Sequence, residues 1–305
     1  MQPIERALLS LEGLSVADAL GERFFGPPSE TMPAMAWRKI PEGPWPYTDD
    51  TEMALSIVES LLEDGGIDAD ALAKRFAARY NSRRGYGGGA HILLMQLRAG
   101  QRWDQVAPQM FGGTGSFGNG SAMRISPLGA YFAEDLDVVC EHARRSALPT
   151  HTNPEGIAGA VATAVMAALA WRVGDGWKAT PAELIQEVLR HTPESQVRQN
   201  IETTLRFDLQ DGSEKVAEWV GSGQRISCQD TVPFCVWCAA HYLHSYEEAF
   251  WATVRCLGDR DTTCAIVGGI VILADRNGLP EEWRIRREPL PADIYDTAYA
   301  VAPRP

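Results

Sequence analysis

Apolar residues recur along most of this chain at the three- and four-residue spacing that gathers them on one face of an α-helix. The alternating pattern of a half-buried strand is nearly absent, with one short candidate near 121–128. The pattern therefore predicts an all-α protein whose helices are joined by glycine- and proline-rich loops at 26–46, 111–120 and 221–227. The predicted helices span 5–20, 50–64, 68–80, 135–147, 181–190, 231–243 and 246–257.

One further segment, from Gly156 to Trp171, consists almost wholly of alanine, valine, glycine and methionine. Because it is apolar on every side, it predicts a helix in the middle of a bundle, with small residues that allow close neighbours. Pro154 after Asn153 is a typical start for such a helix. The chain shows no repeat and no low-complexity tract, so we expect one helical domain over residues 1–305.

Composition and charge narrow the possible partners. The chain has 305 residues and a formal net charge of −12, which disfavours binding to the phosphate backbone of nucleic acids. The N-terminus lacks the apolar core of a signal peptide, and the longest apolar stretch, Ala265 to Ala274, is about half of the ~20 residues of a membrane span. We therefore expect a cytoplasmic protein with no membrane partner, whose six cysteines are free thiols.

Two acidic clusters stand directly before helical runs, and each contains two aspartates beside threonine hydroxyls. They are Thr48-Asp49-Asp50-Thr51-Glu52 and Gly258-Asp259-Arg260-Asp261-Thr262-Thr263. The simplest interpretation is helix capping, because aspartate and threonine are preferred N-cap residues and Asp49-x-x-Glu52 fits a capping box. A cap, however, needs only one acceptor, and the helix dipole stabilises each charge by only about 0.3–1 kcal/mol.

A pair of divalent cations would explain the crowding, because cations remove the repulsion between neighbouring carboxylates. Oxygen ligands without histidine or cysteine favour Mg²⁺, Ca²⁺ or Mn²⁺. We therefore predict that the two clusters, more than 200 positions apart, meet within roughly 10 Å and together hold two ions.

A glycine-rich segment lies between the clusters, with five glycines in the nine residues 112–120. Its exposed backbone N–H groups would suit a diphosphate, and Arg124 could add a positive charge. It is neither a Walker loop nor a dinucleotide fingerprint, since no Gly-Lys-Ser/Thr follows it and no strand precedes it. A flexible surface loop is the alternative. His151, just before the buried helix, could be a scaffold residue or take part in chemistry.

A second possible metal site is Cys235-x-x-Cys238 with His241 and His244. Zinc sites usually draw their ligands from a loop and a second element, whereas these four residues follow one continuous apolar helical run. Core packing is therefore the better interpretation.

Together these segments resemble the ADP-ribosylglycohydrolase family over about residues 11–283. The matching segments are Asp18-Ala19-Leu20-Gly21, Thr48-Asp49-Asp50-Thr51, Gly118-Asn119-Gly120-Ser121-Ala122-Met123-Arg124, Thr150-His151, Asp230-Thr231-Val232-Pro233 and Gly258-Asp259-Arg260-Asp261-Thr262. The resemblance implies an orthogonal all-α bundle with a dinuclear Mg²⁺ centre, in which Mn²⁺ may substitute. The implied metal ligands are Thr48, Asp49, Asp50, Asp259, Asp261 and Thr262. The implied substrate-binding residues are Gly115, Ser116, Gly118, Asn119, Gly120, Ser121, Met123, Arg124 and His151.

The implied reaction is Mg²⁺-dependent cleavage of the glycosidic bond between ADP-ribose and a protein side chain or another acceptor. Asp49 or Asp50 would guide the attacking water while also ligating metal. Two alternatives remain: a family member that only binds ADP-ribose or serves a structural, crystallin-like role, and a hydrolase of a small ADP-ribosyl or ribosyl metabolite. The acceptor linkage stays open.

The chain departs from the family pattern at two places. Family members commonly carry a glutamate seven residues after the aspartate of the Asp-Ala-Leu-Gly segment, and here that position is Phe25, with Glu22 as the nearest acid. The second cluster usually opens Gly-Gly-Asp-Thr-Asp, and here it is Leu257-Gly258-Asp259-Arg260-Asp261, with Leu257 in place of the first glycine and Arg260 in place of the threonine. Glu22 is therefore a candidate catalytic acid, and substrate choice does not carry over from the family.

Overall fold

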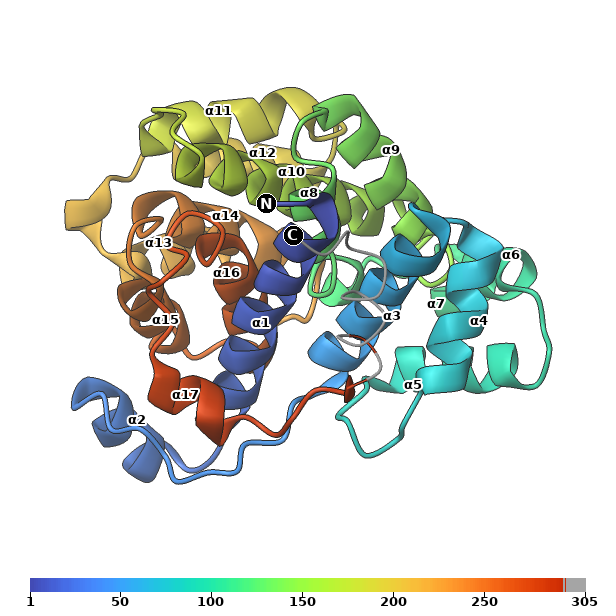
Figure 1. The fold of residues 1–305 in the computed structure, drawn as a ribbon, viewed down its shortest axis with the longest axis horizontal. Coiled ribbons are helices and arrows are strands. Elements are labelled where there is room, and N and C mark those ends of the chain that lie inside the picture. Colours follow the sequence, from blue (N-terminus) through green and yellow to red (C-terminus); the bar gives the residue numbers. More distant parts are fainter. Residues whose placement is uncertain (293, 295–305) are drawn as a thin grey trace.

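The computed structural model describes residues 1–292 and 294, and no β-strand occurs among them. The all-α prediction is confirmed (Figure 1). The predicted domain of 1–305 also includes a C-terminal stretch outside the described residues. The helices are α1 (Pro3–Glu22), α2 (Pro28–Ala36), α3 (Asp49–Asp64), α4 (Ala69–Arg79), α5 (Gly88–Arg98), α6 (Trp103–Val106), α7 (Met110–Gly113), α8 (Ser126–Tyr131), α9 (Leu136–Ala147), α10 (Pro154–Gly174), α11 (Pro181–His191), α12 (Gln196–Thr204), α13 (Ser213–Val220), α14 (Cys228–His241), α15 (Tyr246–Val254), α16 (Arg260–Val271) and α17 (Glu281–Arg286), with 3₁₀ turns η1 (Ala107–Gln109), η2 (Asn119–Ser121) and η3 (Leu209–Asp211).

Each helix predicted from apolar spacing is present, with its ends shifted by a few residues. The possible strand near 121–128 is wrong, because this stretch contains the end of η2 and the start of α8, which begins with a proline in its first turn. The predicted loop 26–46 contains α2, and the glycine-rich loop contains the short α7. Apolar spacing did not indicate α2 because this helix buries only Thr31 and Met35 and contains Pro33, and α7 has only four residues.

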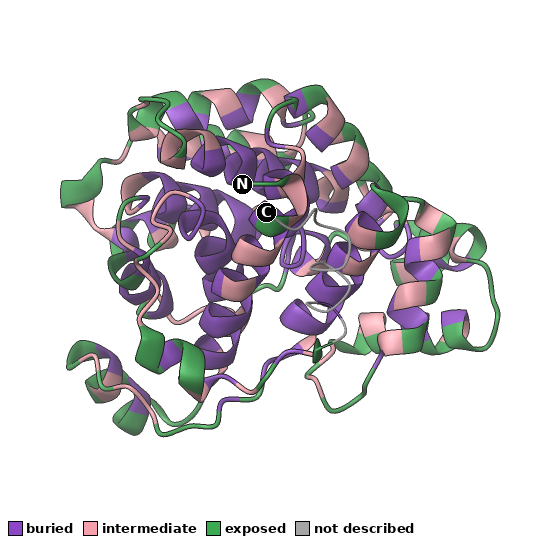
Figure 2. Ribbon diagram, in the orientation of Figure 1, coloured by how far each residue is buried: buried purple, intermediate pink, exposed green. Residues whose placement is uncertain are grey.

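The prediction of a buried helix at 156–171 is confirmed by α10. Every residue from Gly156 to Trp171 except Ile157 is buried (Figure 2). The helix begins after Asn153, whose side chain accepts a hydrogen bond from the Glu155 N–H at 3.0 Å. Helices α8, α9, α11 and α14 pack around it. By length and composition alone α10 could cross a membrane, but here it is the core helix of the fold.

Helices α1 and α16 pack against each other more extensively than any other described pair, and glycines make this possible. A Cβ atom on Gly13 would lie 2.6 Å from the Gly268 carbonyl oxygen, and one on Gly21 would lie 2.6 Å from the Arg260 carbonyl oxygen. Only glycine permits such backbone approach. The contact brings the C-terminal end of α1 to the N-terminal end of α16, and α3 begins beside them (Figure 1).

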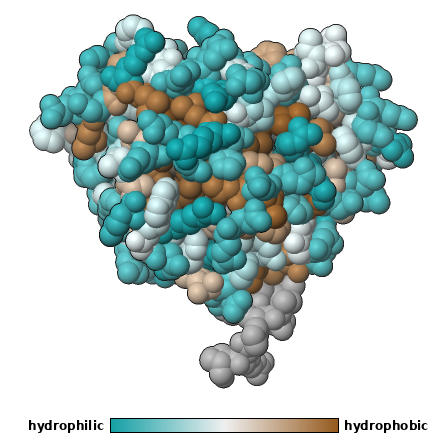
Figure 3. Space-filling model, turned by 90° about the horizontal axis from the view of Figure 1, so that it is seen from above, coloured by the Kyte–Doolittle hydropathy of each residue, from teal (hydrophilic) through white to brown (hydrophobic). Residues whose placement is uncertain are grey.

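The cysteines agree with the expectations drawn from the sequence. All six cysteines are free thiols, as predicted. Cys235 and Cys238 are fully buried, and the His241 ring packs edge-on against Trp237. Burial of these two thiols in the core agrees with the core-packing interpretation. Seen from above, the surface is mostly hydrophilic, with apolar side chains showing between polar ones (Figure 3).

Candidate metal centre and substrate cavity

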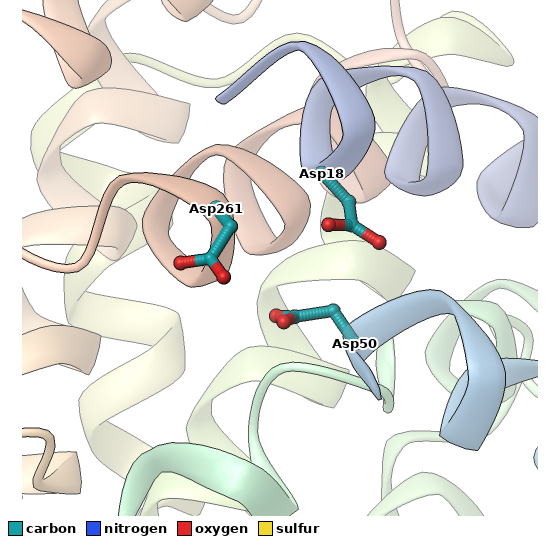
Figure 4. A group of neighbouring side chains, drawn as sticks. All are labelled: Asp18, Asp50 and Asp261. Carbon is teal, nitrogen blue, oxygen red and sulfur yellow. The ribbon is translucent and has the colours of Figure 1, made fainter. Parts of the chain in front are cut away.

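Three carboxylates from distant parts of the chain point toward one another where α1, α3 and α16 meet (Figure 4). Asp18, Asp50 and Asp261 each offer an oxygen atom, and these atoms all lie within 4.8 Å of one another. The predicted convergence of the two acidic clusters is therefore confirmed. Asp18 joins them from the end of α1.

Asp18 ties α1 to the start of α3. Its fully buried carboxylate accepts hydrogen bonds from the Thr48 N–H at 3.0 Å, the Thr48 hydroxyl at 2.7 Å and the Thr51 N–H at 3.2 Å, as well as from the Thr51 hydroxyl. These bonds satisfy donors that a helix N-terminus leaves free. Asp18 thus caps α3 from another helix and fixes the position of Asp50.

The capping-box interpretation of the first cluster is wrong. The N-cap of α3 is Thr48, whose hydroxyl accepts from the Asp50 N–H at 3.3 Å and lies 2.9 Å from the Asp50 carboxylate. Glu52 turns away and accepts from the Asn81 N–H at 2.8 Å and the Tyr86 hydroxyl at 2.9 Å. Capping by Thr48 and Asp18 leaves Asp49 and Asp50 available for another role.

The second cluster is held by residues outside α16, and its partners differ from those of the first cluster. Asp259 is the N-cap of α16 but makes no capping bond with its side chain, which instead accepts from the Asn119 amide at 2.7 Å. Its backbone N–H donates to the Ser222 carbonyl at 3.1 Å. Thr262 lies next to the first cluster, because its hydroxyl is 3.5 Å from the Asp50 carboxylate.

Burial of like charges raises the pKa of these carboxyls. Burial raises the pKa of Asp18 to about 6, and burial together with the negative charge of Asp18 raises that of Asp49 to about 8. The pKa values of Asp50 and Asp261 rise well above the ordinary range, mainly through burial and then through Asp261 and Asp259 respectively. Such a cluster is costly without a counter-charge.

One atom shows where a counter-charge fits. The Asp50 Oδ1 atom is buried and has no hydrogen-bond partner, although such atoms are nearly always paired in folded proteins. An all-oxygen set of carboxylates and threonine hydroxyls around this atom has the chemistry that Mg²⁺ and other hard cations require. The residues present therefore fit a divalent metal.

A cavity of about 470 Å³ opens beside the carboxylates, and four of the predicted metal ligands, Asp49, Asp259, Asp261 and Thr262, form part of its lining. The other two, Thr48 and Asp50, are buried and are not part of this lining. Six of the predicted substrate-binding residues also line the cavity: Ser116, Gly118, Asn119, Gly120, Met123 and His151.

Three other predicted substrate-binding residues are not part of this lining. The Ser121 hydroxyl donates to the Gly156 carbonyl at 2.7 Å, and Gly115 packs against Thr152. Arg124 is fully buried, with its guanidinium 2.8 Å from the Thr150 hydroxyl and 4.4 Å from the centre of the Phe76 ring. We therefore correct its expected contact with a diphosphate: the Arg124 guanidinium donates to the Ser146 carbonyl at 2.9 Å and to the Thr150 hydroxyl, and so joins this part of the chain to the end of α9.

His151 is neutral in this fold. Burial, reinforced by the charge of Arg124, lowers the pKa of the imidazole to about 3. A Cβ atom on Gly120 would lie 3.1 Å from the His151 ring, so the glycine-rich loop rests directly on it. This geometry supports the scaffold interpretation over a role in proton donation.

Several lining residues were not identified from the sequence. They are Phe111, Phe117, Arg225, Ile226, Gly85, Gly87, Gly88, Gly89 and Ala90. The Phe111 and Phe117 rings are both partly exposed, with centres 6.3 Å apart. Phe117 stands inside the glycine-rich segment and could have been noticed there, whereas Ile226 carries no chemical signal. Phe111 and Ile226 have φ angles of 53° and 52°, which is strained backbone for such side chains.

The two departures from the family pattern contact each other. The Arg260 guanidinium carbon lies 4.9 Å from the centre of the Phe25 ring, and its Nη1 donates to the Phe24 carbonyl at 3.0 Å. Glu22, half-buried nearby, has a raised pKa, chiefly because of burial and then because of the charges of Asp18 and Asp259. Glu22 therefore lies within electrostatic range of the metal-site carboxylates, although it is not part of the cavity lining.

Comparisons with known proteins agree with this geometry. The family model described as ADP-ribosylglycohydrolase matches residues 1–303. An uncharacterized protein from Archaeoglobus fulgidus is 31% identical over 295 residues, which cover 89% of this chain and 88% of that protein. ADP-ribosylhydrolase ARH3 from Homo sapiens is 27% identical over 273 residues, covering 78% of this chain and 73% of that protein. A solved structure described as an ADP-ribosylglycohydrolase-related protein complex has a TM-score of 0.70 and 25% identity, covering 98% of this chain and 97% of that one.

Proposed function

This chain belongs to the ADP-ribosylglycohydrolase family and is an ADP-ribosyl hydrolase, and we propose that it cleaves the bond between ADP-ribose and its acceptor at a centre of two Mg²⁺ ions. The observation that carries the proposal is the convergence of Asp18, Asp50 and Asp261 beside a cavity lined by the glycine-rich segment. We propose that the substrate is an ADP-ribosylated protein or a small ADP-ribosyl compound.

We propose that six oxygen-bearing side chains from the two clusters bind the metal ions. Mn²⁺ would substitute for Mg²⁺ because it accepts the same oxygen ligands. A metal ion bound there would polarise ribose oxygens and lower the pKa of a bound water. We propose that Asp49 or Asp50 guides the attacking water and accepts its proton, and Asp49 is the one of the two that lines the cavity. Asp18 holds α3 in register, and Asn119 orients the Asp259 carboxylate. The ligands are Thr48, Asp49, Asp50, Asp259, Asp261 and Thr262.

The cavity suits the rest of the substrate. Phe111 and Phe117 offer partly exposed rings on which a purine base could stack. The segment that carries Phe117 also reaches the carboxylates, because the Asn119 amide donates to Asp259 at 2.7 Å, and Gly118 and Gly120 on either side of Asn119 line the cavity. We infer that the base occupies the aromatic end and that the ribose to be released lies at the carboxylates.

Hydrolysis assays on ADP-ribosyl-arginine, ADP-ribosyl-serine and a small ADP-ribosyl nucleotide, with Mg²⁺ and with chelator, test this proposal. We expect ADP-ribose release from at least one protein-type linkage, and we expect chelator to abolish it. Binding of ADP-ribose without turnover of any substrate would identify a binding protein instead. Turnover confined to the nucleotide would identify a hydrolase of small metabolites.

We expect Glu22→Gln to lower kcat by about 10²-fold, because loss of general acid–base help typically costs about 10²–10⁴-fold. Adding Phe25→Glu to the Glu22→Gln variant should recover part of the lost kcat. The recovery should be incomplete if the new carboxylate forms an ion pair with Arg260. The measurement is kcat on the best substrate of the panel. Glu42→Gln, an exposed glutamate, serves as the matched control. Full activity of Glu22→Gln would exclude Glu22 as the acid.

A further inference from the structure

Arg225 is the only arginine or lysine in the described lining of the catalytic cavity, and we propose that it binds the diphosphate of the substrate. The inference rests on the proposed function and assigns a cation to one part of the same cavity. The other charged lining residues are Asp49, Asp259 and Asp261. His151 supplies no positive charge, because its pKa is too low.

A diphosphate bridge carries negative charge into a cavity that is already acidic. Backbone N–H groups of the glycine-rich segment can donate hydrogen bonds to it, but they carry no net charge. An arginine supplies both charge and a planar set of donors that match phosphate oxygens. The sequence offered Arg124 for this role, and the fold has buried that side chain away from the lining.

The backbone of Arg225 is held in place while its side chain remains available. Its N–H donates to the buried Asp230 carboxylate at 2.5 Å, and the Gly223 N–H donates to the Asp230 carbonyl at 3.2 Å. The Arg225 side chain is exposed and forms no hydrogen bond or salt bridge with the described residues, and its charge lies within electrostatic range of the Asp230 carboxyl. Asp230 belongs to the Asp-Thr-Val-Pro segment, so this segment positions the loop at 221–227.

The same loop is joined to the glycine-rich segment. The Asn119 N–H donates to the Ile226 carbonyl at 3.3 Å, and the Cys228 N–H donates to the Phe117 carbonyl at 3.0 Å. Arg225 therefore stands on a loop whose position is fixed relative to the backbone donors of the glycine-rich segment. Together the two segments form one diphosphate-binding wall.

Titration calorimetry of wild-type and Arg225→Gln protein with ADP-ribose, ADP and adenosine tests this assignment in the full chain. We expect Arg225→Gln to weaken ADP-ribose and ADP binding about tenfold, as loss of one charge-assisted hydrogen bond implies, and to leave adenosine binding unchanged. The difference should shrink as salt is added, because the Arg225 side chain is exposed. Arg255→Gln is the matched control, since Arg255 lines the neighbouring cavity of about 730 Å³ and not the catalytic one.

Unchanged ADP affinity in Arg225→Gln, or an equal loss for adenosine, would overturn the inference. If wild-type protein hydrolyses ADP-ribosyl substrates while the variant binds ADP normally, only the role of Arg225 fails. If wild-type protein binds neither ADP-ribose nor adenosine and hydrolyses no substrate of the panel, the proposed function fails with it.

Discussion

Asp50→Asn is expected to lower Mg²⁺-dependent hydrolysis by at least about 10³-fold while leaving the metal-free protein as stable as the wild type or more so. The large loss follows because Asp50 stands between the two clusters, and metal assistance to such reactions is worth several kcal/mol, or about a thousandfold or more. Stability should not suffer, because the carboxylate is 1% exposed and its Oδ1 atom has no partner. An asparagine has nearly the same volume and cannot ionise, so it removes the free-energy cost that burial places on the ionised carboxylate.

The measurements are turnover against Mg²⁺ concentration and melting temperature with and without Mg²⁺. Wild-type protein should melt at a higher temperature when Mg²⁺ is added, and Asp50→Asn should lose most of that increase. Asp137→Asn, an exposed aspartate of α9, is the matched control and should retain both properties. Near-normal Mg²⁺-dependent turnover in Asp50→Asn would contradict the metal assignment.

The metal-free protein is expected to lose stability as the pH rises from about 4 to about 8. Burial raises the pKa of Asp18 to about 6, and burial with the charge of Asp18 raises that of Asp49 to about 8, against an ordinary value near 3.8. The folded chain therefore keeps protons that the unfolded chain releases over this range, and folding becomes less favourable as the pH increases. Asp18 alone would contribute a loss of about 3 kcal/mol, and Asp50 and Asp261, with pKa values raised further, would add to it.

Calorimetric melting in chelator across this pH range checks the expectation, and the same series with Mg²⁺ is the comparison. Bound cations should remove most of the slope, because they stabilise the ionised carboxylates at high pH. The Asp50→Asn variant should show a shallower slope in chelator than the wild type. A metal-free melting temperature that rises between pH 5 and pH 8 would mean that ionisation of these carboxyls does not destabilise the fold.

The two acidic clusters show how far local pattern reaches. Each could be recognised as a helix start because the residues before an apolar run report on that helix alone. The capping-box interpretation failed because Glu52 does not bond back to the start of α3. Its carboxylate instead accepts hydrogen bonds from Asn81 and Tyr86, which lie outside that helix. Asp18 was part of the family resemblance but was not assigned to the site, since nothing near it in the sequence indicates that its carboxylate caps α3.

The two arginines show what local pattern cannot decide. Arg124 follows the glycine-rich segment directly, yet the packing of α4, α9 and this segment buries its guanidinium against Phe76 and Thr150. Arg225 lies about a hundred residues later in a loop of no evident chemistry, and the fold places it in the cavity lining. Proximity in sequence does not determine which side of a packed segment faces the ligand.

The sequence by itself determined the all-α class, the buried central helix and the two acidic helix starts, because helix periodicity, capping preference and burial of an all-apolar segment act over one or two turns of chain. Tertiary structure alone decided that Asp18 joins Asp50 and Asp261, that Arg124 is buried and that Arg225 lines the cavity. The position of Asp18 beside Asp261 depends on how closely α1 and α16 can approach at Gly13, Gly21 and Gly268. Such contacts join residues hundreds of positions apart, and their geometry follows from the packing of whole helices.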